Sequence, residues 1–478
     1  MRIKRSIVAP AAVALVALAT GGWLLQQGSG DSNNVYFQAR LFDDVLHQVS
    51  DHFVEPKPAS KLYRMAIDGM LQELGDPHSV FMEAKEYENL RIQTQGEYGG
   101  LGIQILKSNG YITVVSPLPG TPAERAGVEA GDQIVEVNGE SARGWSEDQA
   151  VAKLRGPKGS TVDLKVQRPG VANPIPFKLV REEIHVRSVP ASYMLNPTVG
   201  YVRLTVFAES STDEVRQAID SLRAKGMKGL VLDLRENPGG LLDQGVGVGE
   251  LFLKRGQVVS ETRSRVPGQS SRYEAEETDR YPGLPIVVLV NPYTASASEI
   301  LAGALQDHDR ALVLGQTTYG KGSVQTLYPL QGGNWLKLTT ARWFTPSGRS
   351  IQKPYGIGRD TAAADSTGDE DSDSAATPSA AKRPTSAREL PASAAAASTA
   401  GKPAYKTDSG RTVYGGGGIV PDVFVLPDTV TLAERTFLQS LQQVGAQYFD
   451  VRLQYAVEYA RAHPQLPRDF QVTPAMLD

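Results

Sequence analysis

A serine, a histidine and a lysine in the stretch 286–325 could together perform nucleophilic chemistry. Five consecutive aliphatic residues at 286–290 predict a buried strand, and Ser296 follows it where a helical pattern begins. A serine at such a turn lies beside backbone N–H groups that have no intrahelical partner and can hold an oxyanion. Its hydroxyl is a poor nucleophile until a base takes its proton. The alternative interpretation is a capping box, in which Ser296 and Glu299 only satisfy the first turn of the helix.

Two residues could act as that base. His308, next to Asp307, suggests a Ser-His-Asp triad, but it lies 12 residues after Ser296, about 18 Å along a helix, and would point away from the serine turn. Lys321 lies 25 residues after Ser296 between two glycines, which let the backbone pass close to other elements. A lysine desolvated there would lose its proton near neutral pH. The alternative for Lys321 is an ordinary solvated lysine on a turn.

Three motifs follow one another in this stretch: Ser296-Ala-Ser-Glu, Gln-Asp-His308 and Gly-Lys321-Gly-Ser-Val-Gln325. Their order resembles the catalytic core of the carboxyl-terminal processing peptidases, also called tail-specific proteases. The resemblance implies a serine endopeptidase with Ser296 as nucleophile, Lys321 as general base and Gln325 as the residue that orients the lysine. The resemblance therefore favours a Ser-Lys dyad over a triad with His308 and over a role of Ser296 in helix capping alone. The resemblance also implies that the reaction needs no metal ion and no organic cofactor.

The elements that must position these residues alternate between strand and helix, which predicts an α/β core. Aliphatic runs predict strands at 200–206, 229–234 and 286–290, and an amphipathic stretch predicts a helix at 211–225. The resemblance implies a crotonase-like fold for this core. We assign the core to 184–357 and 403–430.

A Gly-Gly turn follows the second of these strands, in Arg235-Glu-Asn-Pro-Gly-Gly-Leu241. Glycines at the carboxyl end of a parallel strand can bring backbone N–H groups close to a ligand. In the family that the chain resembles, this loop supplies part of the oxyanion hole. We therefore predict that the N–H of Gly239 or Gly240, with the N–H of Ala297, holds the oxyanion. The alternative is a plain tight turn.

Short β-like runs with Asn-Gly turns and two helices fill the region 96–183. With the motifs Gly100-Leu-Gly-Ile103 and Gly-Asp-Gln-Ile-Val-Glu-Val-Asn-Gly139, this region resembles a PDZ domain. The resemblance implies that a loop receives the terminal carboxylate of a peptide, which adds as a strand to a sheet edge. That loop consists of Gly100, Leu101, Gly102 and Ile103. The alternative is a PDZ-like domain that serves only as a spacer.

Arg155 follows the second helix predicted in this domain. The resemblance implies that an arginine at this place links the position of the PDZ domain to the catalytic site. We therefore hypothesise that Arg155 reports peptide binding to the protease. The alternative is a surface arginine that faces water or phosphate.

The first 25 residues combine basic residues with an apolar stretch, which predicts a secretory signal or an uncleaved signal anchor. In a cell with two membranes, an anchored chain would face the periplasm from the inner membrane, and a cleaved one would be periplasmic or secreted. Helical patterns occupy 36–95 and 431–478, so we expect a helical segment at each end of the chain.

The composition of the chain limits the kinds of partner and of functional site that it can have. The net charge of −4 gives no indication of a nucleic-acid partner, and the absence of cysteine excludes disulfides and a thiol nucleophile. No partner histidine sits at a useful spacing from His78, so no metal site is expected there. The segment 358–402 has almost no large apolar residue, so we predict a disordered low-complexity insertion.

Together these features predict a serine endopeptidase that cleaves exported proteins after its PDZ domain binds their free, apolar carboxyl-terminal tails. An adaptor protein and a homo-oligomer are compatible with the sequence. Two alternatives from other classes stay open. One is a catalytically silent binding protein built from PDZ and crotonase-like domains, which the joint presence of Ser296, Lys321 and Gln325 disfavours. The other is a Ser-His-Asp hydrolase that uses His308.

Overall fold

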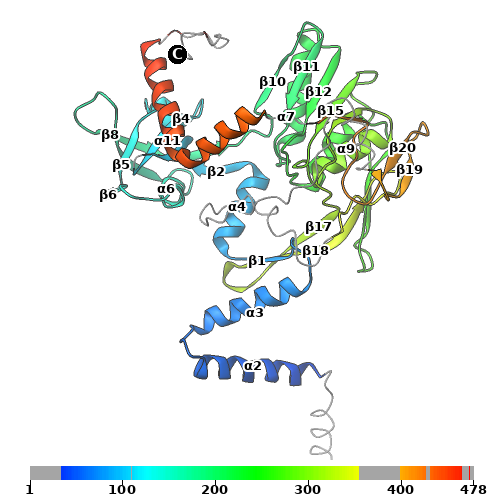
Figure 1. Ribbon diagram of the computed structural model, residues 1–478, viewed down its shortest axis with the longest axis horizontal. Coiled ribbons are helices and arrows are strands. Elements are labelled where there is room, and N and C mark those ends of the chain that lie inside the picture. Colours follow the sequence, from blue (N-terminus) through cyan, green and yellow to red (C-terminus); the bar gives the residue numbers. More distant parts are fainter. Residues whose placement is uncertain are drawn as a thin grey trace, which may run out of the picture. The chain divides into compact units, whose positions relative to one another are not determined.

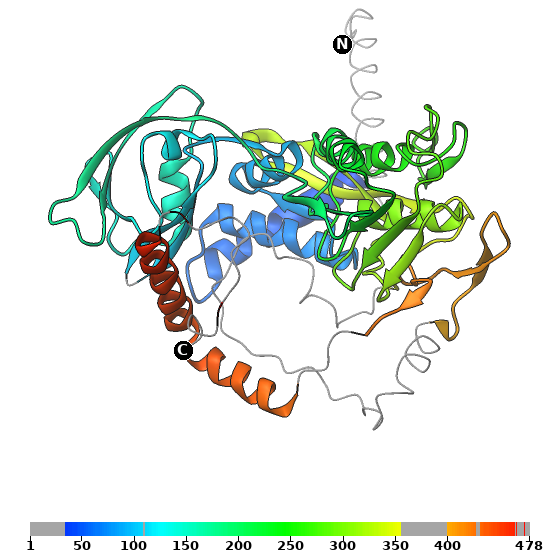
Figure 2. The ribbon, with the colours of Figure 1, turned by 90° about the horizontal axis from the view of Figure 1, so that it is seen from above.

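The computed structural model describes residues 34–108, 110–354, 399–426 and 431–463, together with 465 and 473 (Figures 1 and 2). The predicted signal segment 1–25 lies outside these residues, as does the predicted insertion apart from 399–402. The described chain divides into two units. The smaller contains 34–82 and 327–338, and the larger contains 83–326, 339–354 and the described residues from 399 onward.

The smaller unit is mainly helical. It contains α2 (Val35–His52) and α3 (Ala59–Glu73), followed by β1 (Val80–Met82). β1 pairs antiparallel with the first residues of β18 (Trp335–Phe344), with Val80 opposite Lys337. Asn34 caps α2, because its Oδ1 accepts a hydrogen bond from the N–H of Tyr36 at 2.9 Å.

The larger unit contains a six-stranded sheet whose strands β10, β11, β12 and β15 are labelled in Figure 1. Its order is β10 (Ala191–Met194), β11 (Val199–Arg203), β12 (Gly229–Asp233), β15 (Ile286–Val290), β16 (Leu312–Gly315) and β21 (Val423–Phe424). Neighbouring strands from β11 to β21 are parallel, and β10 is antiparallel to β11. The carboxyl ends of the parallel strands therefore meet at one edge, where ligands bind in such sheets. The predicted strand 200–206 ends early, at Arg203, because Thr205 N–H bonds to Ser188 instead.

Helices follow three of these strands. They are α7 (Ser211–Ala224), α8 (Leu242–Glu250) and α9 (Ala297–Asp307). α9 packs against α8, β16 and β13 (Val258–Arg263), and each of its residues is buried. The apolar core combines the sheet with all three helices, and Val202, Val288 and Leu301 are completely buried within it. The predicted α/β core is confirmed.

A second sheet contains residues of both units. β13 (Val258–Arg263) pairs with β14 (Ser271–Glu274) and with the last residues of β18. β17 (Ser323–Pro329) also pairs with β18, and the connecting η1 (Gln331–Gly333) belongs to the smaller unit. β19 (Ala404–Lys406) and β20 (Thr412–Tyr414) form a separate hairpin.

The β-rich region contains its own sheet and its own apolar core. The sheet has the order β3 (Ile103–Ser108), β4 (Tyr111–Pro117), β5 (Gln133–Val137), β7 (Thr161–Gln167) and β8 (Ile175–Val180), and β6 (Glu140–Ser141) pairs with β5. Its helices are α5 (Pro122–Arg125) and α6 (Glu147–Leu154). The chain enters through α4 (Ala84–Gln95) and β2 (Glu97–Gly100) and leaves through β9 (Glu182–His185), and β2 and β9 pair with each other.

The chain continues after the core into α11 (Leu432–Ala462). This helix bends at Gly445, where the ribbon changes direction in Figure 2. Helical segments therefore occur near both ends of the described chain, as predicted. None of the helices in this described part is both long and apolar enough to cross a membrane.

Candidate active site

Ser296 caps α9 after the turn that leaves β15. Its backbone has φ 56° and ψ −119°, a positive φ that a residue with a side chain rarely adopts. The preceding residue is held by a hydrogen bond of 3.0 Å from the N–H of Ala295 to the carbonyl of Asn237. Such a strained conformation persists only where the surroundings enforce it, and strained residues concentrate at functional sites.

The Gly-Gly turn lies against the Ser296 turn. A Cβ placed on Gly239 would be 2.7 Å from the Cβ of Ser296 and 2.9 Å from the nitrogen of Ala297. Gly239 also has φ 98°, and a Cβ on Gly240 would lie 2.2 Å from the carbonyl oxygen of Phe207. Only glycine therefore fits at either position, and the turn reaches the nucleophile because both side chains are missing.

Hydrogen bonds distinguish the two glycines. The N–H of Gly239 donates to Asn237 Oδ1 at 2.9 Å, which occupies it. Among the described residues, the N–H groups of Gly240 and Ala297 have no hydrogen-bond acceptor. Of the two glycines proposed from the sequence, this arrangement favours Gly240 as the partner of Ala297 in an oxyanion hole.

Glu299 is the residue of the site whose role sequence reasoning missed. Its carboxylate is completely buried, and Oε2 accepts hydrogen bonds from the N–H of Ser296 at 2.8 Å and of Lys321 at 2.9 Å. The two donor nitrogens are therefore no farther apart than 5.7 Å, the sum of these distances. Burial raises the pKa of Glu299 to about 7, although its hydrogen bonds act in the opposite direction.

The only signal in the sequence was the Ser-x-x-Glu spacing, which predicted the capping box that the structure contains. The spacing could not show that the same carboxylate binds a loop 22 residues away. Glu299 thus performs the capping role and also brings together the two residues predicted to form the dyad.

Close backbone contacts hold Lys321. A Cβ on Gly320 would lie 2.9 Å from the nitrogen of Gly418, and one on Gly322 would lie 2.9 Å from the nitrogen of Gln352. The carbonyl of Lys321 accepts a hydrogen bond from the indole of Trp343 at 3.0 Å. Flanking glycines were expected to allow such an approach, and they do.

Gln325 lies two residues into β17. Its amide nitrogen donates to the hydroxyl of Ser323 at 2.9 Å and to that of Thr339 at 3.2 Å. These contacts fix the amide group, and its orienting role toward Lys321 stays a prediction. Ser298, the other serine of the motif, is completely buried and donates to the carbonyl of Asn237 at 3.0 Å, so its hydroxyl is occupied.

His308 is placed away from the nucleophile. Ser296 lies at the first end of α9 and His308 at the last. The 11 residues of the helix between them span about 16 Å. The ring nitrogens of His308 lie 2.8 Å from the carbonyl of Val258 and 2.7 Å from the carboxylate of Asp408. The structure therefore does not bring His308 and Ser296 together, which argues against a triad.

The loop predicted to bind a peptide carboxylate connects β2 to β3. Its carbonyls are occupied, because Leu101 accepts from the N–H of Ala123 at 3.1 Å and Gly102 from that of Leu118 at 2.8 Å. The N–H groups of Leu101 and Gly102 find no acceptor within the described chain. β3, which begins at Ile103, is an edge strand of its sheet, so a peptide could extend that sheet.

Arg155 follows α6 directly, and its guanidinium lies 4.5 Å from the ring centroid of Tyr98. Tyr98 belongs to β2, the strand that ends at Gly100. The two residues line a cavity of about 600 Å³, together with residues of α4 such as Ile92. Arg155 therefore touches the strand that leads into the predicted carboxylate loop.

Comparisons with known proteins give matches along most of the chain. Family models match for peptidase family S41 at 198–363, the PDZ domain at 89–167 and the activating protease CtpB N-terminal domain at 25–86. A carboxy-terminal-processing protease of Bartonella bacilliformis is 44% identical over 334 residues, 69% of this chain and 75% of that protein. The carboxy-terminal processing protease CtpA of Bacillus subtilis is 37% identical over 348 residues, 73% of each chain. Among solved structures, a photosystem II D1 C-terminal processing protease is 33% identical, with 65% of this chain and 89% of that chain covered and a TM-score of 0.37.

Proposed function

The chain belongs to the carboxy-terminal processing proteases of peptidase family S41, and on this premise we propose that it cleaves proteins with a Ser296–Lys321 dyad. One observation carries the proposal. The carboxylate of Glu299 binds the backbone N–H of both residues through one oxygen, at 2.8 and 2.9 Å. A serine and a lysine 25 residues apart in sequence are thereby held at one place, beside a turn with unoccupied N–H groups.

In the proposed mechanism, neutral Lys321 takes the proton of Ser296 Oγ as this oxygen attacks the scissile carbonyl. The N–H groups of Gly240 and Ala297 stabilise the oxyanion of the tetrahedral intermediate. Protonated Lys321 then gives its proton to the leaving amine. Water activated by Lys321 hydrolyses the acyl-enzyme, and Gln325 orients the lysine throughout.

The test compares the wild type with Ser296→Ala, Lys321→Ala and His308→Ala on an unfolded substrate that has an apolar carboxyl terminus. We expect the first two variants to be inactive and His308→Ala to cleave. Lys225→Ala, at an exposed lysine that ends α7, is the matched control and should retain activity. If only Ser296 and His308 mattered, the base would be the histidine. If the wild type cleaved no substrate of any tail sequence, the binding-protein alternative would replace the proposal.

We further propose that the PDZ domain selects substrates by their free carboxyl terminus. The support is the pair of N–H groups in the loop at Leu101 and Gly102 and the free edge of β3. A substrate with an amidated terminus should be cleaved more slowly than its free-acid form, mainly through a higher KM. Equal KM values for the two substrates would contradict this role.

The site of action also remains a proposal. The basic and apolar pattern of 1–25 supports export, with the protease on the periplasmic side of the inner membrane or released after cleavage of the signal. Fractionation of cells that express the full chain, with antibodies against the catalytic core, would test this. Recovery of the active enzyme in the cytoplasmic fraction alone would contradict it.

A further inference from the structure

The carboxylate of Glu299 receives four hydrogen bonds. Oε2 accepts from Ser296 and Lys321, whereas Oε1 accepts from the N–H of Gly320 at 2.7 Å and from the hydroxyl of Thr318. A buried carboxylate with two donors on each oxygen has little freedom to rotate or shift. Its position determines how far the Ser296 turn lies from the Lys321 turn.

Thr318 connects this carboxylate to a distant part of the chain. Its hydroxyl donates to Glu299 and accepts from the N–H of Ile419 at 2.7 Å, while its own N–H donates to the carbonyl of Ile419 at 3.1 Å. A Cβ on Gly418 would lie 2.2 Å from the carbonyl oxygen of Thr318, so the two backbones are in close contact. The rotation of the Thr318 hydroxyl is thus set by the segment that contains Ile419.

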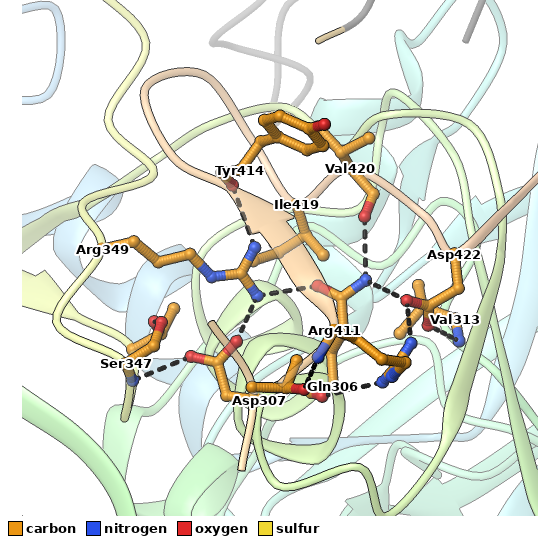
Figure 3. Close-up of polar contacts among 12 residues, drawn as sticks. Gln306, Asp307, Val313, Ser347, Arg349, Arg411, Tyr414, Ile419, Val420 and Asp422 are labelled. Atoms are coloured by element: carbon orange, nitrogen blue, oxygen red, sulfur yellow. Dashed lines mark hydrogen bonds and ion pairs between the residues drawn. The ribbon is translucent and has the colours of Figure 1, made fainter. Parts of the chain in front are cut away.

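That segment is anchored independently, at the other end of α9 (Figure 3). Gln306 donates to the carbonyl of Val420 at 2.9 Å, and Arg349 donates to the carbonyl of Tyr414 at 2.9 Å. Arg411 pairs with Asp422. Residues 414–422 are therefore fixed at both sides of Ile419, which allows Ile419 to act as a rigid support for Thr318.

We propose that Glu299 and Thr318 are positioning residues for the dyad. Glu299 holds the Ser296 and Lys321 turns at the distance needed for proton transfer, and Thr318, oriented by Ile419, holds Glu299. This inference rests on the proposed function, because it assigns a task to residues around the same dyad. It adds that residues 414–422 belong to the catalytic apparatus although they contribute no side chain to the reaction.

The test uses variants that change the hydrogen bonds of one side chain each. Thr318→Val removes the hydroxyl at nearly constant volume, and Glu299→Gln replaces an acceptor oxygen by an NH2 donor that opposes at least one N–H group in either orientation of the amide. A displacement of about 1 Å can lower a rate on the order of 10²-fold, so we expect losses of that size in kcat. KM should stay near its wild-type value, because neither residue contacts the predicted tail-binding loop.

The chain offers a matched control next to Thr318. The hydroxyl of Thr317 is also buried but has no hydrogen-bond partner among the described residues. Thr317→Val should therefore keep the wild-type kcat, and Thr318→Ser, which retains the hydroxyl, should restore most of it. A purely structural role would predict similar effects for both valine variants and no specific rescue by serine.

Several outcomes would overturn the inference. A kcat of Thr318→Val within about twofold of that of Thr317→Val would do so, as would an effect confined to KM. If circular dichroism shows that Thr318→Val does not fold, Glu299→Gln decides in its place by the same criteria. Activity in Ser296→Ala would instead refute the proposed dyad, so the two failures are distinguishable.

Discussion

Replacement of Arg349 by methionine should strongly destabilise the catalytic core. The guanidinium is completely buried and donates to Asp307 at 2.6 Å, to Gln306 Oε1 at 2.7 Å and to the carbonyl of Tyr414 at 2.9 Å (Figure 3). Burial lowers the pKa of Arg349, and the charge of Asp307 opposes this shift. The pair is therefore a desolvated ion pair within the apolar core.

The expected loss in the free energy of unfolding follows from the contacts that Asp307 keeps after the substitution. The side chain of Asp307 is only 1% exposed. Without Arg349, its carboxylate keeps one hydrogen-bond donor among the described residues, the N–H of Ser347 at 3.0 Å. Removal of one partner from a buried pair costs about 3–5 kcal/mol in the free energy of unfolding. Methionine fills much of the arginine volume, so a cavity should add little. Replacement of both partners, in Arg349→Met with Asp307→Leu, should cost less than the sum of the single changes.

Urea unfolding at pH 7, in a Ser296→Ala background that prevents self-cleavage, measures these free energies. Arg216→Met is the matched control, since its pair with Asp213 has side chains 36% and 69% exposed and should contribute at most about 1 kcal/mol. A loss below about 1 kcal/mol in Arg349→Met, or strict additivity in the double variant, would refute the reasoning.

Three further predictions concern the site and its pH dependence. Gly239→Ala should abolish hydrolysis, because its Cβ would collide with that of Ser296 at 2.7 Å, whereas Gly69→Ala, with no atom within 4 Å, should leave the rate unchanged. Burial raises the pKa of Glu299 to about 7, so the ionised form that accepts the four hydrogen bonds prevails above this pH. The stability that the bound proton contributes at low pH should be lost as the pH rises from 4.5 to 7. Urea unfolding in the Ser296→Ala background should show this loss, of about 3 kcal/mol, relative to the same background with Glu299→Gln, and parallel pH curves would contradict it. Arg155→Ala should make the cleavage rate independent of the substrate tail. A retained tail preference would disprove the hypothesis that Arg155 reports peptide binding to the protease.

Much of the site could be predicted because its signals are local. The aliphatic run 286–290 forms β15, and Ser296 begins the helix that follows. The spacing argument against His308 also holds, since the histidine ends the same helix and binds Val258 and Asp408. These features depend on strand and helix periodicity, which a single sequence displays.

The remaining features depend on contacts between distant segments. The sequence could not choose between Gly239 and Gly240, because the choice depends on the amide of Asn237, which occupies the first N–H. It also gave no indication that Ile419 supports Thr318, since 101 residues separate them. Side-chain hydrogen bonds of this kind follow from the packed fold and have no periodic pattern.

The strained backbone of Ser296 and the network around Arg349 are connected by α9. A positive φ at a residue with a side chain costs about 1–3 kcal/mol and persists only if the neighbouring elements cannot move. All residues of α9 are buried, so the helix cannot shift without disturbing the core. Its first turn is held by Glu299, and its last residues, Gln306 and Asp307, are held by Arg349. Because the same network also fixes the segment behind Thr318, loosening one end of α9 should affect the dyad at the other end as well as the stability of the core.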